Sequence, residues 1–433
     1  MCALEGTLFM SKTTSLFTLQ SSDKRLEEAV SWAKEQALAY ASDSDPVGPW
    51  YEAALPGREA FCMRDVAHMS TGAAALGLSA HTKNMLLKFA ENISESKDWC
   101  TFWEITREGL PCPDDYASDD NFWYNLPANF DIIACCFRMH LWSRDKNYLN
   151  DERLLSFYEK SLNEYVRRWD RDGDGIPDHV RGEGRRGIAS YVEDALTPKV
   201  GGDLVAAQYA AYAAYSEMAK LMGWPEKAEH YARLAERLQK TYEEEWWSEK
   251  DGRFSAAILQ DGSYHSEYYL SAQYLPIYFG LIATEAKRRA AVNDIKRNGV
   301  SNIEEMSHLP DVYYAVGEKE EAYRIMLQLC DKQMKRREYP EVSYSVIGNV
   351  VTGLLGIKPC ADQAALEIAP QLPEGLEWVS VGGVAVLDNW IDVEVRDGHV
   401  NVRNAQGPSI RVRSGGVEQL LAEGETSSFD IRM

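Results

Sequence analysis

The sequence has little positive charge and no long apolar run. Its 46 lysine and arginine residues are outnumbered by 67 aspartate and glutamate residues, which gives a formal net charge of -21. Because such a chain repels polyanions, we expect neither nucleic acid nor an anionic membrane as a partner. No stretch approaches the roughly 20 apolar residues of a membrane-spanning helix, and residues 1–6 do not resemble the start of a signal peptide. These absences predict a cytoplasmic protein.

The cysteines exclude two further kinds of site. The eight cysteines are scattered, form no Cys-x-x-Cys pair and include the neighbours Cys135 and Cys136 in an apolar segment. This distribution predicts neither a zinc site nor a thioredoxin-like redox site. It is typical of small buried side chains in a reducing compartment.

Several catalytic signatures are also missing. There is no Gly-x-Ser-x-Gly nucleophile turn, no Gly-x-x-x-x-Gly-Lys phosphate loop and no His-x-x-x-His pair. The chain is instead rich in aromatic residues, with 12 tryptophans and 23 tyrosines, and several of its loops carry carboxylates. Because flat aromatic faces stack on sugar rings, carbohydrate chemistry is the best match, and it needs no cofactor for catalysis.

Helical periodicity runs from about residue 24 to residue 357. It predicts twelve helices, at residues 24–42, 65–79, 82–95, 121–144, 150–168, 203–222, 225–246, 266–282, 283–297, 309–316, 319–336 and 345–357. The segment from Leu204 to Tyr215 is apolar nearly all round, whereas the segment from Pro225 to Glu245 is strongly amphipathic. Buried helices that alternate with amphipathic ones predict two concentric layers, which is an (α/α)6 barrel.

The pattern changes to a period of two after Pro359. Asp397-Gly398 separates two alternating runs and predicts a hairpin. We therefore expect three parts: an N-terminal extended or β arm over residues 1–23, the barrel over 24–358 and a small antiparallel β domain over 359–433. Within the arm, the alternation of residues 7–20 predicts a strand.

Glu341 occupies a short polar loop in front of an apolar helix, expected from Val346 to Ile357. This order predicts a carboxylate at the mouth of a helix-walled cavity, where it polarises a water or a sugar hydroxyl. The alternative is a solvated acid or a first-turn charge that the helix dipole favours.

Two further segments combine polar and aromatic side chains that suit a sugar. Arg64 and Asp65 begin a predicted inner helix, and together they offer a donor and an acceptor to adjacent hydroxyls. The alternative for Asp65 is a helix cap paired with Arg64. Loop aromatics lie next to acids or amides at Trp103-Glu104 and at Trp123-Tyr124, and some of these rings could equally belong to the core.

The segment from Trp169 to Gly202 carries two candidate sites. Asp170, Asp172, Asp174 and Asp178 stand at positions one, three, five and nine of a loop with glycine at six, a spacing that wraps calcium. Position twelve is arginine, so the bidentate glutamate is missing, and a plain Asp-Gly turn is the alternative. The segment ends in Glu193-Asp194, of which we expect one to point into the barrel and the competing interpretation is a solvated acidic loop.

The chain resembles the six-hairpin glycosidases, and within them the α-L-rhamnosidase-like branch. The resemblance rests on the glutamate loop at Glu341, the segment Ser343 to Asn349, Gly353-Leu-Leu-Gly-Ile-Lys-Pro359 and the entry to the β domain at Leu366-Glu-Ile-Ala-Pro370. It implies that Glu341 is the general base, with Tyr344 of the same segment among the sugar-binding residues.

The resemblance also implies roles in the first half of the chain. Arg64-Asp65 is similar to a sugar-clamping pair, and Pro56-Gly-Arg58-Glu59 is similar to a loop that carries the general acid, which would be Glu59. Other branches place that acid after the fifth helix, which here means Glu193 or Asp194. The chain lacks the Gly-Trp-x-Gly-Asp that follows the loop in rhamnosidases.

Together these features predict an inverting, exo-acting glycoside hydrolase with paired carboxylates and an oligosaccharide or glycoside substrate. We expect Arg64, Asp65, Trp103 and Glu341 to converge on one funnel, with Glu193 as the favoured acid. The alternatives are a non-catalytic carbohydrate-binding barrel, or a sugar phosphorylase, lyase or epimerase on the same fold. A phosphorylase would need a basic pocket, for which Arg336 and Arg337 lie close to Glu341 in sequence.

Overall fold

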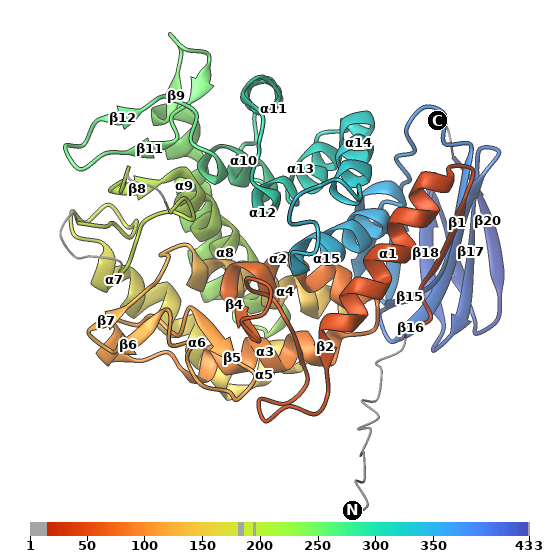
Figure 1. Cartoon of the computed structure of the whole chain (residues 1–433), viewed down its shortest axis with the longest axis horizontal. Helices are drawn as coiled ribbons and strands as arrows, with labels where there is room; N and C mark the ends of the chain where they lie inside the picture. Colours follow the sequence, from red (N-terminus) through yellow and green to blue (C-terminus); the bar gives the residue numbers. More distant parts are fainter. Residues whose placement is uncertain (1–14, 181–185, 194–195, 432–433) are drawn as a thin grey trace, which may run out of the picture.

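The computed structural model describes residues 15–180, 186–193 and 196–431. Six helices in its centre form a closed inner ring (Figure 1). In chain order they are α2 (Met63–Ala75), α4 (Ala128–Ser143), α8 (Gly202–Leu221), α10 (Ser271–Tyr278), α13 (Leu309–Ala315) and α15 (Pro340–Asn349). Each of these helices packs on the next. The ring closes because α13 contacts η3 (Val350–Leu354), which continues α15, and α15 packs on α2.

An outer layer of helices surrounds this ring (Figure 1). It comprises α1 (Lys24–Tyr40), α3 (Ser79–Glu91), the continuous run of α6 (Glu152–Glu159), η2 (Lys160–Tyr165) and α7 (Val166–Trp169), then α9 (Pro225–Glu245), α11 (Glu285–Asn298) and α14 (Lys319–Leu329). The predicted (α/α)6 barrel is therefore confirmed. In the described part of the chain, no helix is long and apolar enough to cross a membrane.

The sequence explains which helices lie inside. Most side chains of α8 are buried, as expected for a helix that is apolar nearly all round. In α9 the buried residues follow the three- and four-residue spacing of a single face: Ala228, Tyr231, Ala235, Leu238 and Tyr242. The opposite face of α9 carries its charged residues to the surface, and this places α9 in the outer layer.

Several predicted helix boundaries are wrong; the helix expected over 319–336, for example, ends at Leu329. The helix expected from residue 121 begins at Ala128, because Asn121–Phe122 forms strand β7 against β6 (Tyr116–Ser118). The helix expected from residue 266 begins at Ser271. The helix expected after Glu341 begins at Pro340, since proline suits the first position of a helix, so Glu341 lies in the first turn of α15 and not in a loop.

The loops at one end of the barrel contain short paired strands. They are β2 (Ala41–Ser42) with β3 (Trp50–Tyr51), β4 (Ala60–Cys62) with β5 (Glu104–Thr106), β6 with β7, β8 (Val200–Gly201) with β11 (Ala257–Ile258) and β12 (Tyr264–His265), and β9 (Trp247–Ser248) with β10 (Arg253–Phe254). Two short helices, α5 (Asn147–Asn150) and α12 (Ile303–Met306), complete the connections.

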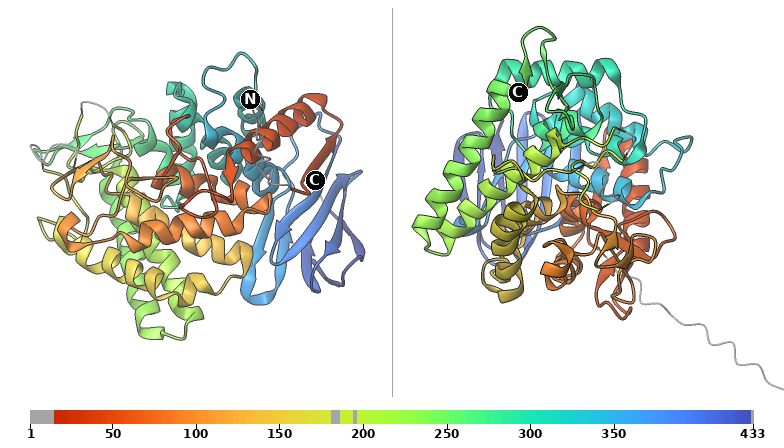
Figure 2. Two further views of the ribbon diagram at one scale, coloured as in Figure 1. Left: turned by 60° about the horizontal axis from the view of Figure 1, so that its bottom comes forward. Right: turned by 90° about the vertical axis from the view of Figure 1, so that its left-hand side faces the viewer.

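The C-terminal domain consists of two sheets beside the barrel (Figure 2). The first sheet has the order β1 (Thr18–Ser21), β15 (Trp378–Val386), β16 (Asn389–Arg396), β17 (His399–Gln406), β20 (Thr426–Asp430). The second has the order β13 (Ile357–Cys360), β14 (Ala365–Ile368), β18 (Ile410–Ser414), β19 (Val417–Leu421). The predicted hairpin is confirmed, with positive φ at Asp397 and Gly398, whereas the pairing of β14 with β18 is parallel and not antiparallel as expected.

The start of the chain is tied to this domain. β1 pairs antiparallel with β15, so the described part of the N-terminal segment is an edge strand of the C-terminal sheet. The strand expected over residues 7–20 is seen from Thr18; residues 7–14 lie outside the described residues. The domain is fixed to α4 through Trp142, whose indole donates to the Ala385 carbonyl at 2.9 Å and whose carbonyl accepts from Leu387 at 2.8 Å.

The closest approach in the inner ring is between α2 and α15. A Cβ placed on Gly72 would lie 2.0 Å from the carbonyl oxygen of Tyr344, whereas one on Gly348 would come no closer than 3.3 Å, to the nitrogen of Gly72. Glycine at position 72 therefore allows the ring to close.

We predict that Gly72→Ala lowers the free energy of unfolding by about 2 kcal/mol, because the added methyl group forces two packed helices apart. Gly348→Ala is the matched control at the same interface. It should change stability by less, since the tighter contact is offset by the helix preference of alanine. Chemical denaturation would measure both, and equal effects would contradict this account of the ring.

Candidate funnel site

A pocket of about 420 Å³ opens at the end of the barrel where the inner helices begin. Residues at or just before the start of each inner helix line it: Arg64 and Asp65 for α2, Trp123 for α4, Glu193 for α8, Leu270 for α10, Glu305 for α13 and Tyr339 for α15. We call this pocket the funnel. Side chains that are far apart in the sequence meet here because six helices start at one rim.

Arg64 and Asp65 form the floor of the funnel. The Tyr339 hydroxyl donates to Asp65 at 2.6 Å, and Arg64 lies 3.2 Å from Glu304 and 3.4 Å from Asp65. Burial, aided by the charge of Glu341, raises the pKa of Asp65 well above its ordinary value. The Oδ1 atom of Asp65 and the Nε atom of Arg64 have no hydrogen-bond partner, and these two buried atoms face each other at 3.4 Å.

One wall of the funnel holds a carboxylate pair and a guanidinium. Arg58 donates to Glu104 at 2.7 Å and to Asp115 at 3.3 Å. Burial and the nearby Asp115 raise the pKa of Glu104 to about 7, although Arg58 opposes the shift. The antiparallel pairing of β4 with β5 fixes Glu104 opposite Cys62, at the entrance to α2.

The same wall carries Glu193 and three aromatic side chains. The indole of Trp123 donates to Glu193 at 3.1 Å, while burial raises the pKa of Glu193. The ring centroids of Trp103 and Tyr191 are 6.3 Å apart, and the Arg64 guanidinium carbon lies 5.8 Å from the ring centroid of Tyr191. This wall thus combines a carboxyl group with rings that suit a sugar face.

The opposite wall contains Glu304 and Glu305, which the sequence analysis missed. Both lie on α12, which begins after the capping residue Asn302. Glu304 accepts from Arg64 and Arg336. Glu305 is only 8% exposed, its Oε2 atom has no hydrogen-bond partner, and burial raises its pKa to about 7. The sequence did contain a signal for this pair. Glu304 and Glu305 lie in the segment before a helix expected at 309, just as Glu193 lies in the segment before the helix expected at 203.

Glu341 lies beneath the floor and not at the mouth of the funnel. Its side chain is fully buried, and one oxygen is 2.6 Å from Nδ1 of His68. Its second oxygen is buried without a hydrogen-bond partner. The expected exposed position of this carboxylate is therefore wrong, because Glu341 lies inside α15 on the face that packs against α2.

The structure sorts the other predicted site residues into three groups. Arg64, Asp65, Trp103, Glu104, Trp123 and Glu193 line the funnel. Tyr124 and Tyr344 are core residues that donate to Asn129 and to the Ala37 carbonyl, so their predicted contact with a sugar is wrong. Glu59 is exposed and pairs with Arg107 outside the funnel, and Asp194 lies outside the described residues.

The aspartate loop gathers three carboxylates at a point away from the funnel. One oxygen each of Asp170, Asp172 and Asp174 lies within 4.8 Å of the others. Asp170 accepts from the backbone of Gly173 and Gly175, which is how a tight turn would also be held. Burial and the neighbouring acids raise the pKa of Asp174 to about 6. Asp178 is buried, and its Oδ1 atom has no hydrogen-bond partner.

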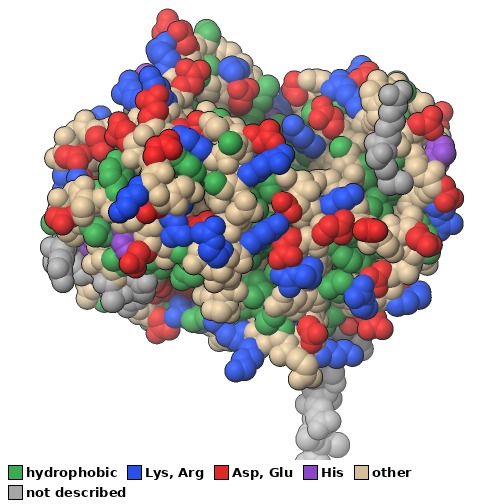
Figure 3. Space-filling model, turned by 90° about the horizontal axis from the view of Figure 1, so that it is seen from above, with side chains coloured by type: hydrophobic (Ala, Val, Ile, Leu, Met, Phe, Trp, Pro, Cys, Tyr) green, Lys and Arg blue, Asp and Glu red, His purple; other side chains and the backbone are tan. Residues whose placement is uncertain are grey.

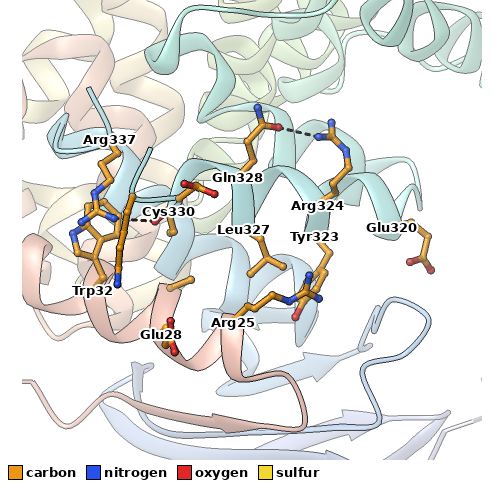
Figure 4. A pocket seen from close by; sticks show the side chains of 13 residues that line it. Arg25, Glu28, Trp32, Glu320, Tyr323, Arg324, Leu327, Gln328, Cys330 and Arg337 are labelled. Atoms are coloured by element: carbon orange, nitrogen blue, oxygen red, sulfur yellow. Dashed lines mark hydrogen bonds between the residues drawn. The ribbon is translucent and has the colours of Figure 1, made fainter. Parts of the chain in front are cut away.

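A larger groove of about 850 Å³ lies between α1 and α14 (Figure 4). Its wall includes Trp32 and Arg324. The guanidinium carbon of Arg337 lies 4.5 Å from the ring centroid of Trp32, and Arg324 donates to Gln328 at 2.9 Å. Acidic and basic side chains are interspersed over the face seen in Figure 3. Unlike the funnel, the groove has no buried carboxyl group in its lining, so it lacks the groups for acid–base chemistry.

Comparisons with known proteins agree with this architecture. Residues 134–334 match the family model of the bacterial alpha-L-rhamnosidase six-hairpin glycosidase domain, and residues 361–421 match that of the glycosyl hydrolase family 65 C-terminal domain. No curated protein matches the sequence significantly.

Three of the solved structures with the same fold are longer than this chain. The alpha-L-rhamnosidase from Aspergillus terreus is 14% identical with a TM-score of 0.66, over 97% of this chain and 50% of that one. The alpha-L-rhamnosidase from Dictyoglomus thermophilum is 12% identical with a TM-score of 0.67, over 96% and 50%. A putative kojibiose phosphorylase from the human microbiome is 9% identical with a TM-score of 0.64, over 96% and 63%.

This chain therefore spans about half the length of the rhamnosidases that it matches. Identities this low support the shared fold only. The two family models and the inner and outer rings of helices agree: the chain is similar to the six-hairpin glycosidases, and within them to the α-L-rhamnosidase branch.

Proposed function

We propose that the chain is a glycoside hydrolase that cleaves a terminal sugar from its substrate inside the funnel. The observation that carries the proposal is that two carboxyl groups from different segments line the funnel, Glu193 beside Trp123 and the buried Glu305 on α12. Hydrolysis of a glycosidic bond needs two carboxyl groups in different protonation states.

The surroundings of the two groups favour different roles. Glu305 has a pKa of about 7 and an oxygen without a partner, so it can carry a proton at neutral pH and deliver it to the leaving oxygen. The Trp123 indole and the charge of Arg64 both favour the ionised form of Glu193 against the effect of burial. Glu193 would therefore act as the base, in place of the acid role predicted from the sequence.

In the proposed reaction Glu305 protonates the glycosidic oxygen while the bond from that oxygen to the anomeric carbon breaks. Glu193 removes a proton from a water that attacks the same carbon from the other side, so the configuration inverts. Room for that water requires a separation of roughly 6.5–9.5 Å between the two carboxyl groups. Arg64 and Asp65, which line the floor of the funnel, would hold the sugar hydroxyls.

A closed floor supports action at a chain end. Asp65 and the fully buried Glu341 lie beneath the funnel, where α2 packs against α15. A sugar chain could enter this funnel but could not pass through it. We infer that a terminal residue is released, and a terminal α-L-rhamnoside is the first substrate to test because of the similarity to rhamnosidases.

A sugar phosphorylase is the second candidate, since one structural neighbour is a putative kojibiose phosphorylase. The charges of the funnel favour the hydrolase. Its lining contains the three cations Arg58, Arg64 and Arg336, and each forms an ion pair with a carboxylate that also lines the funnel. Phosphate would have to displace one of these carboxylates before it could bind.

The decisive experiment is a panel of aryl glycosides assayed with and without inorganic phosphate. We expect turnover of at least one member in the absence of phosphate. Turnover only with phosphate would identify a phosphorylase. No turnover across the panel, together with binding of a free sugar, would support the carbohydrate-binding alternative.

We predict that Glu305→Gln and Glu193→Gln each lower kcat by about 100-fold or more, because each removes one proton-transfer group. A leaving group that needs no protonation, such as dinitrophenolate, should restore turnover for Glu305→Gln and not for Glu193→Gln. Glu59→Gln is the matched control, since Glu59 is exposed outside the funnel. Near wild-type turnover in either funnel variant would contradict the assignment.

The pH dependence of the wild type follows from the pKa of Glu305. Because the acid must be protonated and its pKa is about 7, kcat/KM should fall roughly tenfold per pH unit above that value. Glu305→Gln should lose this alkaline limb on the dinitrophenyl substrate. If the variant keeps the limb, another group is the acid, and Glu104, with a pKa also near 7, is the next to test.

We also propose that the aspartate loop binds a structural calcium ion. Support comes from the three clustered carboxylates of Asp170, Asp172 and Asp174 and from the buried, unpartnered oxygen of Asp178. A bound cation would offset the mutual repulsion of these acids.

If calcium binds there, a chelator should lower the melting temperature and added calcium should restore it, by mass action on the folded state. Asp172→Asn should weaken this response, whereas Asp261→Asn, in an exposed turn, should leave it unchanged. An identical melting curve in chelator, with no calcium by metal analysis, would mean that the loop is a plain turn.

A further inference from the structure

A chain of three ionisable side chains lies beneath the funnel floor, in which His68 and Glu341 are buried and Asp311 is partly exposed. Nδ1 of His68 is 2.6 Å from Glu341, and its Nε2 is 3.3 Å from Asp311. His68 comes from α2, Glu341 from α15 and Asp311 from α13, so the chain crosses the inner ring. Both ring nitrogens of His68 therefore face carboxylate oxygens.

Between two ionised carboxylates, only one protonation state of His68 satisfies both contacts. A neutral imidazole has one N–H donor and one lone pair, and the lone pair would face a carboxylate in either tautomer. An imidazolium donates to both carboxylates. Its two acidic partners raise the pKa of His68 to about 9, although burial opposes the shift.

The surrounding groups fit this assignment. His308 stacks on His68 with centroids 3.6 Å apart and planes 10° apart, and burial beside that cation lowers the pKa of His308 well below its ordinary value. A neutral His308 can donate from Nδ1 to the Glu304 carbonyl at 3.2 Å, while its Nε2 lies 3.7 Å from Glu341, outside hydrogen-bond distance. From α10, Tyr278 presents its ring edge-on at 5.9 Å, and from α4 both Asp131 and Arg138 act at longer range.

A metal ion is a poorer explanation of the same cluster. Ligand atoms of His68, His308 and Glu341 lie within 4.8 Å of one another. However, the two imidazole rings are stacked nearly parallel, so their lone pairs run side by side and do not converge on one point. Both nitrogens of His68 are also engaged with carboxylates.

We infer that His68 is a buried imidazolium that acts as a positioning residue: it fixes Glu341 as an anion beneath Asp65 and Arg64. The negative charge of Glu341 acts on both members of that floor pair. It favours the protonated form of Asp65, whose hydroxyl would then donate to the sugar. It also attracts the Arg64 guanidinium and holds it on the floor. The effect on catalysis rests on the proposed function, whereas the charge state of His68 does not.

The charge state can be measured without any substrate, by ¹⁵N NMR of the protein labelled at histidine. Among the eight histidines, one should keep the doubly protonated signature up to a pH of about 9. Asp311→Asn should lower the midpoint of that signal by one pH unit or more. His230→Gln, on the exposed face of α9, is the control and should leave it unmoved.

Two results would overturn the assignment: every histidine neutral by pH 8, or zinc bound at the cluster by metal analysis. His68→Gln should remove the signal and identify it. If that variant does not fold, the wild-type titration and Asp311→Asn still decide the question.

The positioning role has its own readout once a substrate is known. His68→Gln should raise KM about tenfold with a smaller effect on kcat, because Asp65 and Arg64 hold the sugar and do not react with it. An unchanged KM in a folded variant would show that the imidazolium is purely structural. Failure of the proposed hydrolase would leave the NMR result untouched, so the two claims can fail separately.

Discussion

The arrangement of the site depends on one constraint: six inner helices begin at the same rim, so the positive ends of six helix dipoles converge on one pocket. Carboxylates gathered there are partly offset by these dipoles. The same rim also supplies the guanidinium groups that pair with them, such as Arg58 and Arg64. The funnel can therefore concentrate acids at a density that an ordinary surface would not tolerate, and burial can then raise the pKa of some of them.

Much of the fold could be predicted because periodicity is a local property. The buried pattern of α8 and the single apolar face of α9 indicate which ring each helix joins, without knowledge of its neighbours. Helix starts were harder to place. The polar character of the segment around Glu341 suggested a loop, but Pro340 is a favourable first residue for a helix. The earlier start moves the carboxylate from the cavity mouth to a buried face.

The site could be predicted only in part, for a physical reason. Arg64 and Asp65 begin the helix α2, Glu193 lies in the loop before the long helix α8, and these positions were visible in the sequence. Glu305 lies on the four-residue helix α12, which is too short for a periodic signal, and its burial depends on packing between segments remote in sequence. Likewise, nothing in the local sequence of His68 shows that Glu341 and Asp311 flank it.

The central claim is that a terminal sugar binds in the funnel with its anomeric substituent toward Glu305. A crystal structure of Glu305→Gln with an unhydrolysed substrate from the glycoside panel tests this claim most directly. The account predicts the sugar above Asp65 and Arg64, with the glycosidic oxygen within hydrogen-bond distance of residue 305 and Glu193 on the opposite side of the anomeric carbon. A sugar found only in the groove between α1 and α14, or one whose glycosidic oxygen faces away from residue 305, would contradict it.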